Sequence, residues 1–139
     1  MSLYPKDKVS VANYRIERAF ATLDEARLVA NMSRWNLAAN RLYYSLYYAI
    51  SALLLSDGIP SHTHKGTITQ VNLYYIKTGK LTTEEGKLIR QLFLMRNEAD
   101  YEDFIFVTEE QIADLIPKVQ SLLNKLVGMN PLAAPQPSN

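Results

Sequence analysis

Apolar residues recur at three- and four-residue steps through most of this chain, the spacing typical of amphipathic helices. Four long segments carry the pattern, at about 10–31, 34–57, 82–99 and 108–127, and a shorter one covers about 64–77. The inner stripe of the second segment comprises Ala39, Leu42, Tyr43, Leu46, Ala49, Ile50, Leu53 and Leu54. The pattern therefore predicts five helices.

Polar residues and glycines mark the ends of these helices. Thr82–Glu85 and Thr108–Gln111 both have the Thr-x-x-Glu/Gln spacing of a capping box. Ser10 and Ser33 stand where they could cap the first two helices. Pro117 lies inside the last helix, where we expect a kink or the loss of one hydrogen bond. The stop signals are Gly58, Pro60 and Gly79.

The arrangement of these segments predicts an all-α fold. The alternating stretch Tyr101–Val107 has no second strand to pair with, and we interpret it as an extended connector. Helices joined by short loops indicate an antiparallel up-and-down bundle of four long helices and one short helix. We expect the bundle at 10–127, an N-terminal arm at 1–9, and a disordered tail at 128–139 that is rich in Pro, Ala, Ser and Asn.

The composition of the chain excludes several classes of protein but does not indicate a reaction. Among 139 residues, 15 are basic and 14 acidic, so nucleic-acid binding would need a local patch of charge. Cysteine is absent, which excludes disulfides and thiolate metal sites. We find neither a secretory signal nor an apolar run long enough to span a membrane, and we expect a cytoplasmic protein.

Arg96 is the strongest candidate for function, because it borders the apolar stripe of its helix. A guanidinium in that position needs acceptors or a ligand, since burying an unpaired charge is costly. One interpretation is a structural ion pair with Asp100, four residues further on. The other is a phosphate site, in which the planar fork of Arg96 and the amide of Asn97 contact a nucleotide or an RNA.

Four of the nine tyrosines lie within the six residues Tyr43–Tyr48. Helical spacing pairs Tyr43 with Tyr47 on one face and Tyr44 with Tyr48 on the next, so we expect one pair in the core and the other lining a cleft or a partner surface. Core packing or a dimer interface is the simple interpretation. The functional one is a platform on which bases stack, beside the basic residue Arg41 and the polar residue Asn40.

Both histidines, His62 and His64, lie in the loop before the short helix, with Lys65 beside them. No third metal ligand is suggested nearby, so we do not expect a metal site. Capping or solvent exposure is the simple interpretation. The functional one is that His64 and Lys65 face an anion at the start of the helix. A group that moves protons near neutral pH would be one of these histidines or a carboxylate with a shifted pKa.

Several strings together resemble one known family, the HEPN domain, over about residues 10–127. They are Asn40–Ala49, His64–Gly66, Lys77–Gly79 and Leu92-Phe93-x-x-Arg96-Asn97-x-Ala99-Asp100-Tyr101. Within that family the chain most resembles the small prokaryotic UPF0332-like branch. The resemblance implies a helical bundle that dimerises and that partners a minimal nucleotidyltransferase in toxin–antitoxin-like pairs.

The resemblance also bears on catalysis. Many members of the wider family are metal-independent ribonucleases, whose motif is an arginine, a polar residue and, a few positions later, a histidine. Arg96 and Asn97 match its first half, whereas Tyr101, Glu102 and Asp103 occupy the window of the histidine. Because the residue best able to move a proton near neutral pH is absent there, we expect weak catalysis or none.

We therefore expect a HEPN-like module that binds a nucleotide or RNA phosphate, forms a homodimer, pairs with a nucleotidyltransferase-like protein, and uses no metal or cofactor. The expected ligand-binding residues are Arg96, Asn97, Asp100, Tyr101, Asn40, Arg41, Tyr44, His64 and Lys65. The candidates for a catalytic role are Arg96, Asn97 and Tyr101. One alternative is a metal-independent ribonuclease with a site across the dimer interface. Another is a purely structural helical interaction module.

Overall fold

The computed structural model describes residues 5–101 and 106–136, and for Pro5 and residues 97–101 it describes the backbone alone. The helices are α1 (Pro5–Asn31), α2 (Trp35–Ser56), α3 (His64–Val71), the π-helical turn η1 (Asn72–Ile76), α4 (Thr83–Tyr101) and α5 (Glu109–Met129). The described residues contain no strand. The predicted all-α fold is therefore confirmed.

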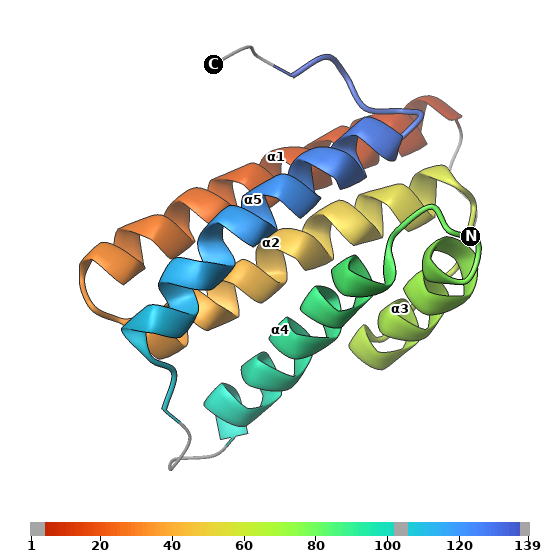
Figure 1. Cartoon of the computed structure of the whole chain (residues 1–139). Coiled ribbons are helices and arrows are strands. Elements are labelled where there is room, and N and C mark those ends of the chain that lie inside the picture. Colours follow the sequence, from red (N-terminus) through yellow and green to blue (C-terminus); the bar gives the residue numbers. More distant parts are fainter. Residues whose placement is uncertain (1–4, 102–105, 137–139) are drawn as a thin grey trace.

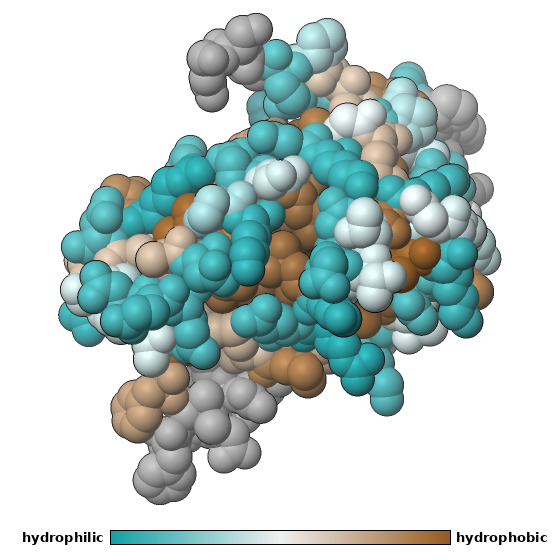
Figure 2. Space-filling model, in the orientation of Figure 1, coloured by the Kyte–Doolittle hydropathy of each residue, from teal (hydrophilic) through white to brown (hydrophobic). Residues whose placement is uncertain are grey.

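Helix α2 lies at the centre of the bundle and packs against α1, α4 and α5. Figure 1 shows α1 and α2 running antiparallel, with α5 beside both and with α4 and α3 on the other side of α2. No described helix is long and apolar enough to cross a membrane. Figure 2 shows the same face as a surface, where hydrophilic residues border hydrophobic ones in the middle.

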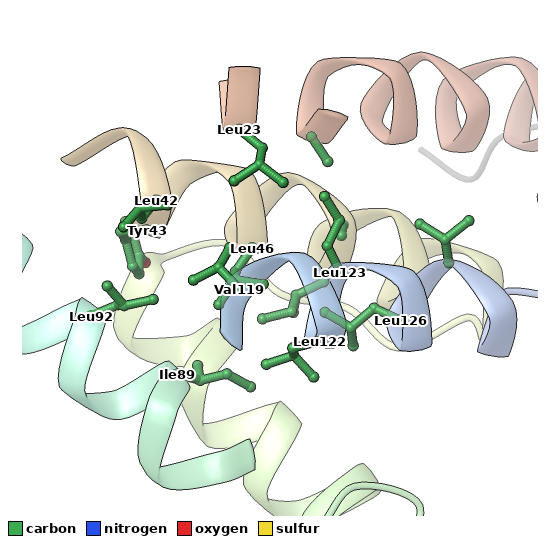
Figure 3. Packing of buried hydrophobic residues seen from close by; sticks show 14 of the residues in the cluster. Leu23, Leu42, Tyr43, Leu46, Ile89, Leu92, Val119, Leu122, Leu123 and Leu126 are labelled. Atoms are coloured by element: carbon green, nitrogen blue, oxygen red, sulfur yellow. The ribbon is translucent and has the colours of Figure 1, made fainter. Parts of the chain in front are cut away.

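The core forms along the predicted stripe of α2, and all eight of its residues are buried. Figure 3 shows side chains of α2 meeting those of α4 and α5, with Leu42 and Tyr43 near Leu92, and Leu46 near Val119. Full burial of a leucine-sized side chain stabilises a fold by roughly 1.5–3 kcal/mol. The helical spacing of α2 thus accounts for its central position.

Both predicted capping boxes are present. The backbone N–H of Thr82 donates to Glu85 Oε1 over 2.8 Å, and the backbone N–H of Glu85 donates to Thr82 Oγ1 over 3.1 Å. The box of Thr108 and Gln111 has the same two bonds, at 2.9 and 3.2 Å. These bonds satisfy N–H groups that the first turn of a helix leaves without partners.

The two predicted serine caps are wrong. Helix α1 begins at Pro5, where the fixed φ of proline suits a first helical turn, and Ser10 Oγ donates back to the carbonyl of Lys6 inside the helix. Ser33 has a φ of 60° and lies in the turn, while Arg34 occupies the N-cap of α2 without a side-chain cap bond. Ser10 lies inside α1 and Ser33 lies in the turn before the N-cap of α2, so neither serine caps a helix.

The segment predicted as one short helix consists of an α-helix followed by a π-helical turn. Helix α3 changes at Asn72 into the wider turn η1, where the N–H of Lys77 donates to the carbonyl of Asn72. Tyr75 is buried in the core from this turn. Gly79, with a φ of 79°, follows as the predicted stop signal.

Residues 130–134 lie against α1, although we expected disorder from residue 128. Helix α5 continues through Gly128 to Met129. Asn13 then holds the chain, since its Nδ2 donates to the carbonyl of Leu132 over 2.9 Å and its Oδ1 accepts from the N–H of Ala134 over 2.8 Å. An amide that pairs with backbone in this way fixes a segment that has no periodicity of its own. The division into arm, bundle and tail stays a prediction.

Candidate functional site

The tyrosine-rich turn of α2 meets the beginning of α3 and the second half of α4. Five side chains lie together there, and we call them the Arg96–His64 site: Tyr43, Tyr44, Tyr47, His64 and Arg96. Helix α2 supplies the tyrosines because residues one turn apart share a face. Helix α3 supplies His64, and helix α4 supplies Arg96.

Tyr43 anchors the site in the core. Its side chain is 2% exposed and lies between α2 and α4, near Leu92 (Figure 3). Its hydroxyl lies 2.8 Å from Nδ1 of His64, a hydrogen-bond distance. The ring of Tyr43 thus packs in the core, while its hydroxyl contacts the site through His64.

His64 contacts three tyrosines of α2. Its ring stacks on Tyr47 with centroids 4.3 Å apart and planes inclined by 25°, and it meets Tyr44 edge-on at 5.6 Å. It is the first residue of α3, whose N-cap Thr63 accepts a hydrogen bond from the N–H of Gly66. The cap fixes the start of α3, and the tyrosines fix the imidazole.

Arg96 reaches the same tyrosines from α4. Its Nη2 donates to the hydroxyl of Tyr44 over 3.0 Å. Its guanidinium carbon lies 5.6 Å from the ring centroid of Tyr44 and 5.9 Å from that of Tyr43, within the range of cation–π attraction. The ion pair proposed with Asp100 involves a side chain outside the described residues and stays a prediction.

The site favours a neutral imidazole and a protonated phenol. Burial lowers the pKa of His64 below its ordinary 6.5, and the positive charge of Arg96 lowers it further. Burial also raises the pKa of Tyr43 far above its ordinary 10, with Tyr47 acting in the same direction and Arg96 against it. At pH 7 the Arg96–His64 site therefore carries the charge of Arg96 and a largely neutral His64.

Asn40 and Arg41 lie on the neighbouring side of Tyr44. Nε and Nη2 of Arg41 both donate to Oδ1 of Asn40, over 3.1 and 2.8 Å, and Nη1 forms a 3.5 Å ion pair with Glu25. The guanidinium carbon of Arg41 lies 5.4 Å from the ring centroid of Tyr44. Two arginines from different helices thus approach one tyrosine ring.

The structure brings together most, but not all, of the predicted site residues that it describes. Arg96, Tyr44 and His64 form the site, and Asn40 and Arg41 adjoin it through Tyr44. Lys65 is exposed, and no described contact joins its amine to the others. The side chains of Asn97, Asp100 and Tyr101 lie outside the described residues.

Two members of the site, Tyr43 and Tyr47, were not among the predicted binding residues. We expected the tyrosines to divide into a buried pair and a surface pair, but Tyr43 alone is buried and Tyr44, Tyr47 and Tyr48 are half-buried. The division is wrong because Tyr44, Tyr47 and Tyr48 all pack against the core while each keeps part of its surface exposed. Helical spacing places Tyr43 and Tyr47 on one face, but it does not say which residue of the loop will meet them.

The site is a partly exposed surface, and it lies apart from two hollows of the described structure. One hollow, of about 1080 Å³, lies between α1, α5 and the tail, and another, of about 330 Å³, lies between α3, η1 and α4. Neither is lined by Arg96 or His64. Within the described residues, no group of three or more His, Asp or Glu side chains could hold a metal ion, and His62 is exposed.

Comparison with known proteins assigns this architecture to a family. The HEPN domain matches residues 12–129. The chain is 35% identical over 120 residues to a UPF0332 protein of Thermotoga maritima, covering 86% of this chain and 91% of the relative. It is 32% identical over 110 residues to a Methanocaldococcus jannaschii protein named "Putative toxin MJ0142", covering 79% and 75%. A second protein of that organism, "Putative toxin MJ0605", is 26% identical over 111 residues, covering 80% and 82%.

Proposed function

The chain belongs to the HEPN family, and on this premise we propose that it binds the phosphate of a nucleotide or an RNA at the Arg96–His64 site. We further propose that it acts in a toxin–antitoxin-like pair with a minimal nucleotidyltransferase. The observation that carries the phosphate site is the position of Arg96. Its guanidinium is held by a tyrosine hydroxyl and two tyrosine rings on a partly exposed surface.

The chemistry of the arginine supports this proposal. A guanidinium has five N–H donors in a planar fork, which matches two oxygens of a phosphate group. The bond to Tyr44 engages Nη2 and holds that end of the guanidinium on α2. Because the tyrosines already restrict the side chain of Arg96, a ligand has less conformational entropy to remove when it binds.

His64, which contacts the same tyrosines as Arg96, supports the same ligand. Tyr43 occupies Nδ1 of His64, so Nε2 is the ring nitrogen that can meet a ligand. A bound anion would favour the charged imidazolium, opposing the burial and the Arg96 charge that keep the free group neutral. The site thus offers a permanent positive charge and a second group that can become positive on binding.

The proposed pair with a nucleotidyltransferase is supported by the names of two relatives and by apolar side chains exposed on the surface of the chain. Two relatives carry the name of putative toxins, and the family resemblance implies a nucleotidyltransferase partner and a homodimer. Large apolar side chains are exposed at the end of the bundle where α1, α2 and α5 meet, among them Met32 at 66% and Phe106 at 78%. Exposed apolar groups of this kind suit a protein contact. Co-purification with a nucleotidyltransferase encoded beside its gene would support the pair, and absence of any complex would contradict it.

A metal-independent ribonuclease is the second candidate, and the position of His64 favours it. Helix α4 lacks the histidine of the family motif, but α3 places His64 on the same tyrosines as Arg96. Neutral His64 would take the proton of a ribose 2′-hydroxyl as that oxygen attacks the adjacent phosphorus. The 5′ oxygen would leave and take a proton from water, giving a 2′,3′-cyclic phosphate. Detection of that product, and its loss in His64→Gln, would select this candidate over simple binding.

The binding proposal is tested with AMP and with Arg96→Ala. We expect the variant to bind AMP at least about ten-fold more weakly, since a charge-assisted hydrogen bond contributes roughly 1.5–3 kcal/mol. Arg90→Ala is the matched control, because Arg90 is an exposed arginine of the same helix and lines a hollow away from the site. Calorimetry that finds no binding of AMP, or equal binding by Arg96→Ala, would overturn the proposal.

A further inference from the structure

Arginines continue beyond the Arg96–His64 site, along the line where α1 and α2 pack together. Nη1 of Arg15 donates to the carbonyl of Ser51 over 3.3 Å. The guanidinium carbon of Arg18 lies 5.5 Å from the ring centroid of Tyr48. With Arg41 and Arg96 over Tyr44, these residues form what we call the arginine strip: Arg15, Arg18, Arg41 and Arg96.

Three residues of the strip, Arg15, Arg18 and Arg41, follow the line of contact between two antiparallel helices. Contacts between α1 and α2 occur at Arg15 with Ser51, at Arg18 with Tyr48, and at Glu25 with Arg41. Each step back along α2 is therefore a step forward along α1. From Ser51 to Arg41 the rise of an α-helix gives roughly 15 Å. In the stacked geometry of a duplex, one strand carries a phosphate per about 3.4 Å of helix axis, and a less stacked single strand spaces its phosphates farther apart, so the strip is long enough for a few successive phosphates.

The strip concentrates positive charge in a chain of net charge +1. One ion pair of the described residues lies on it, between Arg41 and Glu25 at 3.5 Å. Within the described residues neither Arg15 nor Arg18 forms an ion pair, and the contact of Arg18 is with an aromatic ring. Contact with an aromatic ring and partial burial of the side chain restrict an arginine without neutralising its charge, so the guanidinium can still bind an anion.

We propose that the arginine strip binds the phosphate backbone of a single-stranded nucleic acid, one end of which lies at the Arg96–His64 site. This inference rests on the proposed phosphate site and names its ligand as an oligonucleotide. Arg15, Arg18 and Arg41 form a single row along α1 and α2, and Arg96 of α4 adjoins that row at Tyr44, so the strip suits the phosphates of one strand. Positive residues that alternate with aromatic ones are the usual surface for a single strand.

The test compares a short strand with a mononucleotide. The probes are AMP and a labelled eight-nucleotide 2′-O-methyl RNA, which cannot be cleaved through its 2′ oxygen. We expect the wild-type chain to bind the strand more tightly than AMP and with a steeper salt dependence. The double variant Arg15→Ala/Arg18→Ala should bind the strand about ten-fold or more weakly and lower the salt slope by about 1.4, since each phosphate contact on a single strand contributes about 0.7.

Arg27→Ala/Arg90→Ala is the matched control, because it removes the same charge from α1 and α4 outside the strip. Arg27 pairs with Asp24 and Gln120 on the side of α1 that faces α5. The control should bind the strand as the wild type does, and both double variants should bind AMP normally. Circular dichroism and melting temperature will show that each variant is folded.

The outcomes separate this inference from the proposal on which it rests. Equal strand affinity in the two double variants, with AMP binding intact, would overturn the strip and leave the phosphate site standing. A preference for duplex RNA of equal length would overturn the assignment to a single strand. Absence of binding to both probes would overturn the strip and the phosphate site together.

Discussion

The hydroxyl of Tyr43 lies 2.8 Å from Nδ1 of His64, and this contact joins the buried centre of α2 to the first residue of α3. The ring of Tyr43 is buried in the core, so the imidazole takes its position from the central helix of the bundle. The stacking of His64 on Tyr47 fixes its plane as well. Core packing and the candidate site are therefore coupled through one hydrogen bond.

Tyr43→Phe tests that coupling. The variant keeps the buried ring and removes the hydroxyl, so we expect the free energy of unfolding to fall by about 0.5–1.5 kcal/mol, the usual contribution of one hydrogen bond. Denaturant titration measures the change. Tyr74→Phe is the control, since its side chain is 42% exposed in η1, and it should unfold as the wild type does. Equal stability of the two variants would show that the Tyr43 contact contributes nothing.

The pKa of His64 gives a second prediction. Burial and Arg96 lower this pKa below 6.5, so the folded chain binds fewer protons than the unfolded chain at pH values between the lowered pKa and 6.5. The stability contributed by neutral His64 is therefore complete above pH 6.5 and is lost as the pH falls through that interval. Proton NMR of the imidazole measures the folded pKa, and His62→Gln assigns the remaining imidazole signal to His64. A folded pKa at or above 6.5 would contradict the prediction.

Much of the fold could be predicted, because local patterns determine it. The stripe of α2 follows from helical spacing, and all of its predicted residues are buried. The capping boxes of Thr82 and Thr108 follow from residue type and spacing, and their bonds are present. The predicted caps at Ser10 and Ser33 are wrong because a serine can also bond to the carbonyl four residues back inside a helix, as Ser10 does, or lie in a turn, as Ser33 does.

The candidate site could be predicted only in part. Arg96 and Tyr44 were chosen because their positions on single helices were informative, and the structure joins them. Contact of His64 with Tyr43 and Tyr47 depends on the path of the chain between α2 and α3, which no local pattern specifies. The arginine strip likewise needs the antiparallel register of α1 and α2, which places Arg18 beside Tyr48.

Gly128→Ala and Gly79→Ala should change stability in opposite directions. Gly128 lies within α5, and a Cβ there would meet no atom within 4 Å, so alanine should stabilise the chain by roughly 0.5–1 kcal/mol. Gly79 has a φ of 79°, which side chains with a Cβ adopt at a cost of roughly 1–2 kcal/mol. Thermal melts compare the two. A loss of stability in Gly128→Ala would mean that the last turn of α5 is not helical in solution.

Arg96→Lys separates the charge of Arg96 from its shape. Lysine keeps the positive charge but has no planar fork, so it cannot give two parallel bonds to a phosphate or lie flat against tyrosine rings. Losing one of two charge-assisted bonds costs about 1.5 kcal/mol, which predicts AMP binding roughly ten-fold weaker than in the wild type. Calorimetry with Arg90→Lys as the control measures the difference. If Arg96→Lys binds AMP as tightly as the wild type, the site uses charge alone, and the contacts of Arg96 with Tyr43 and Tyr44 serve packing instead of recognition.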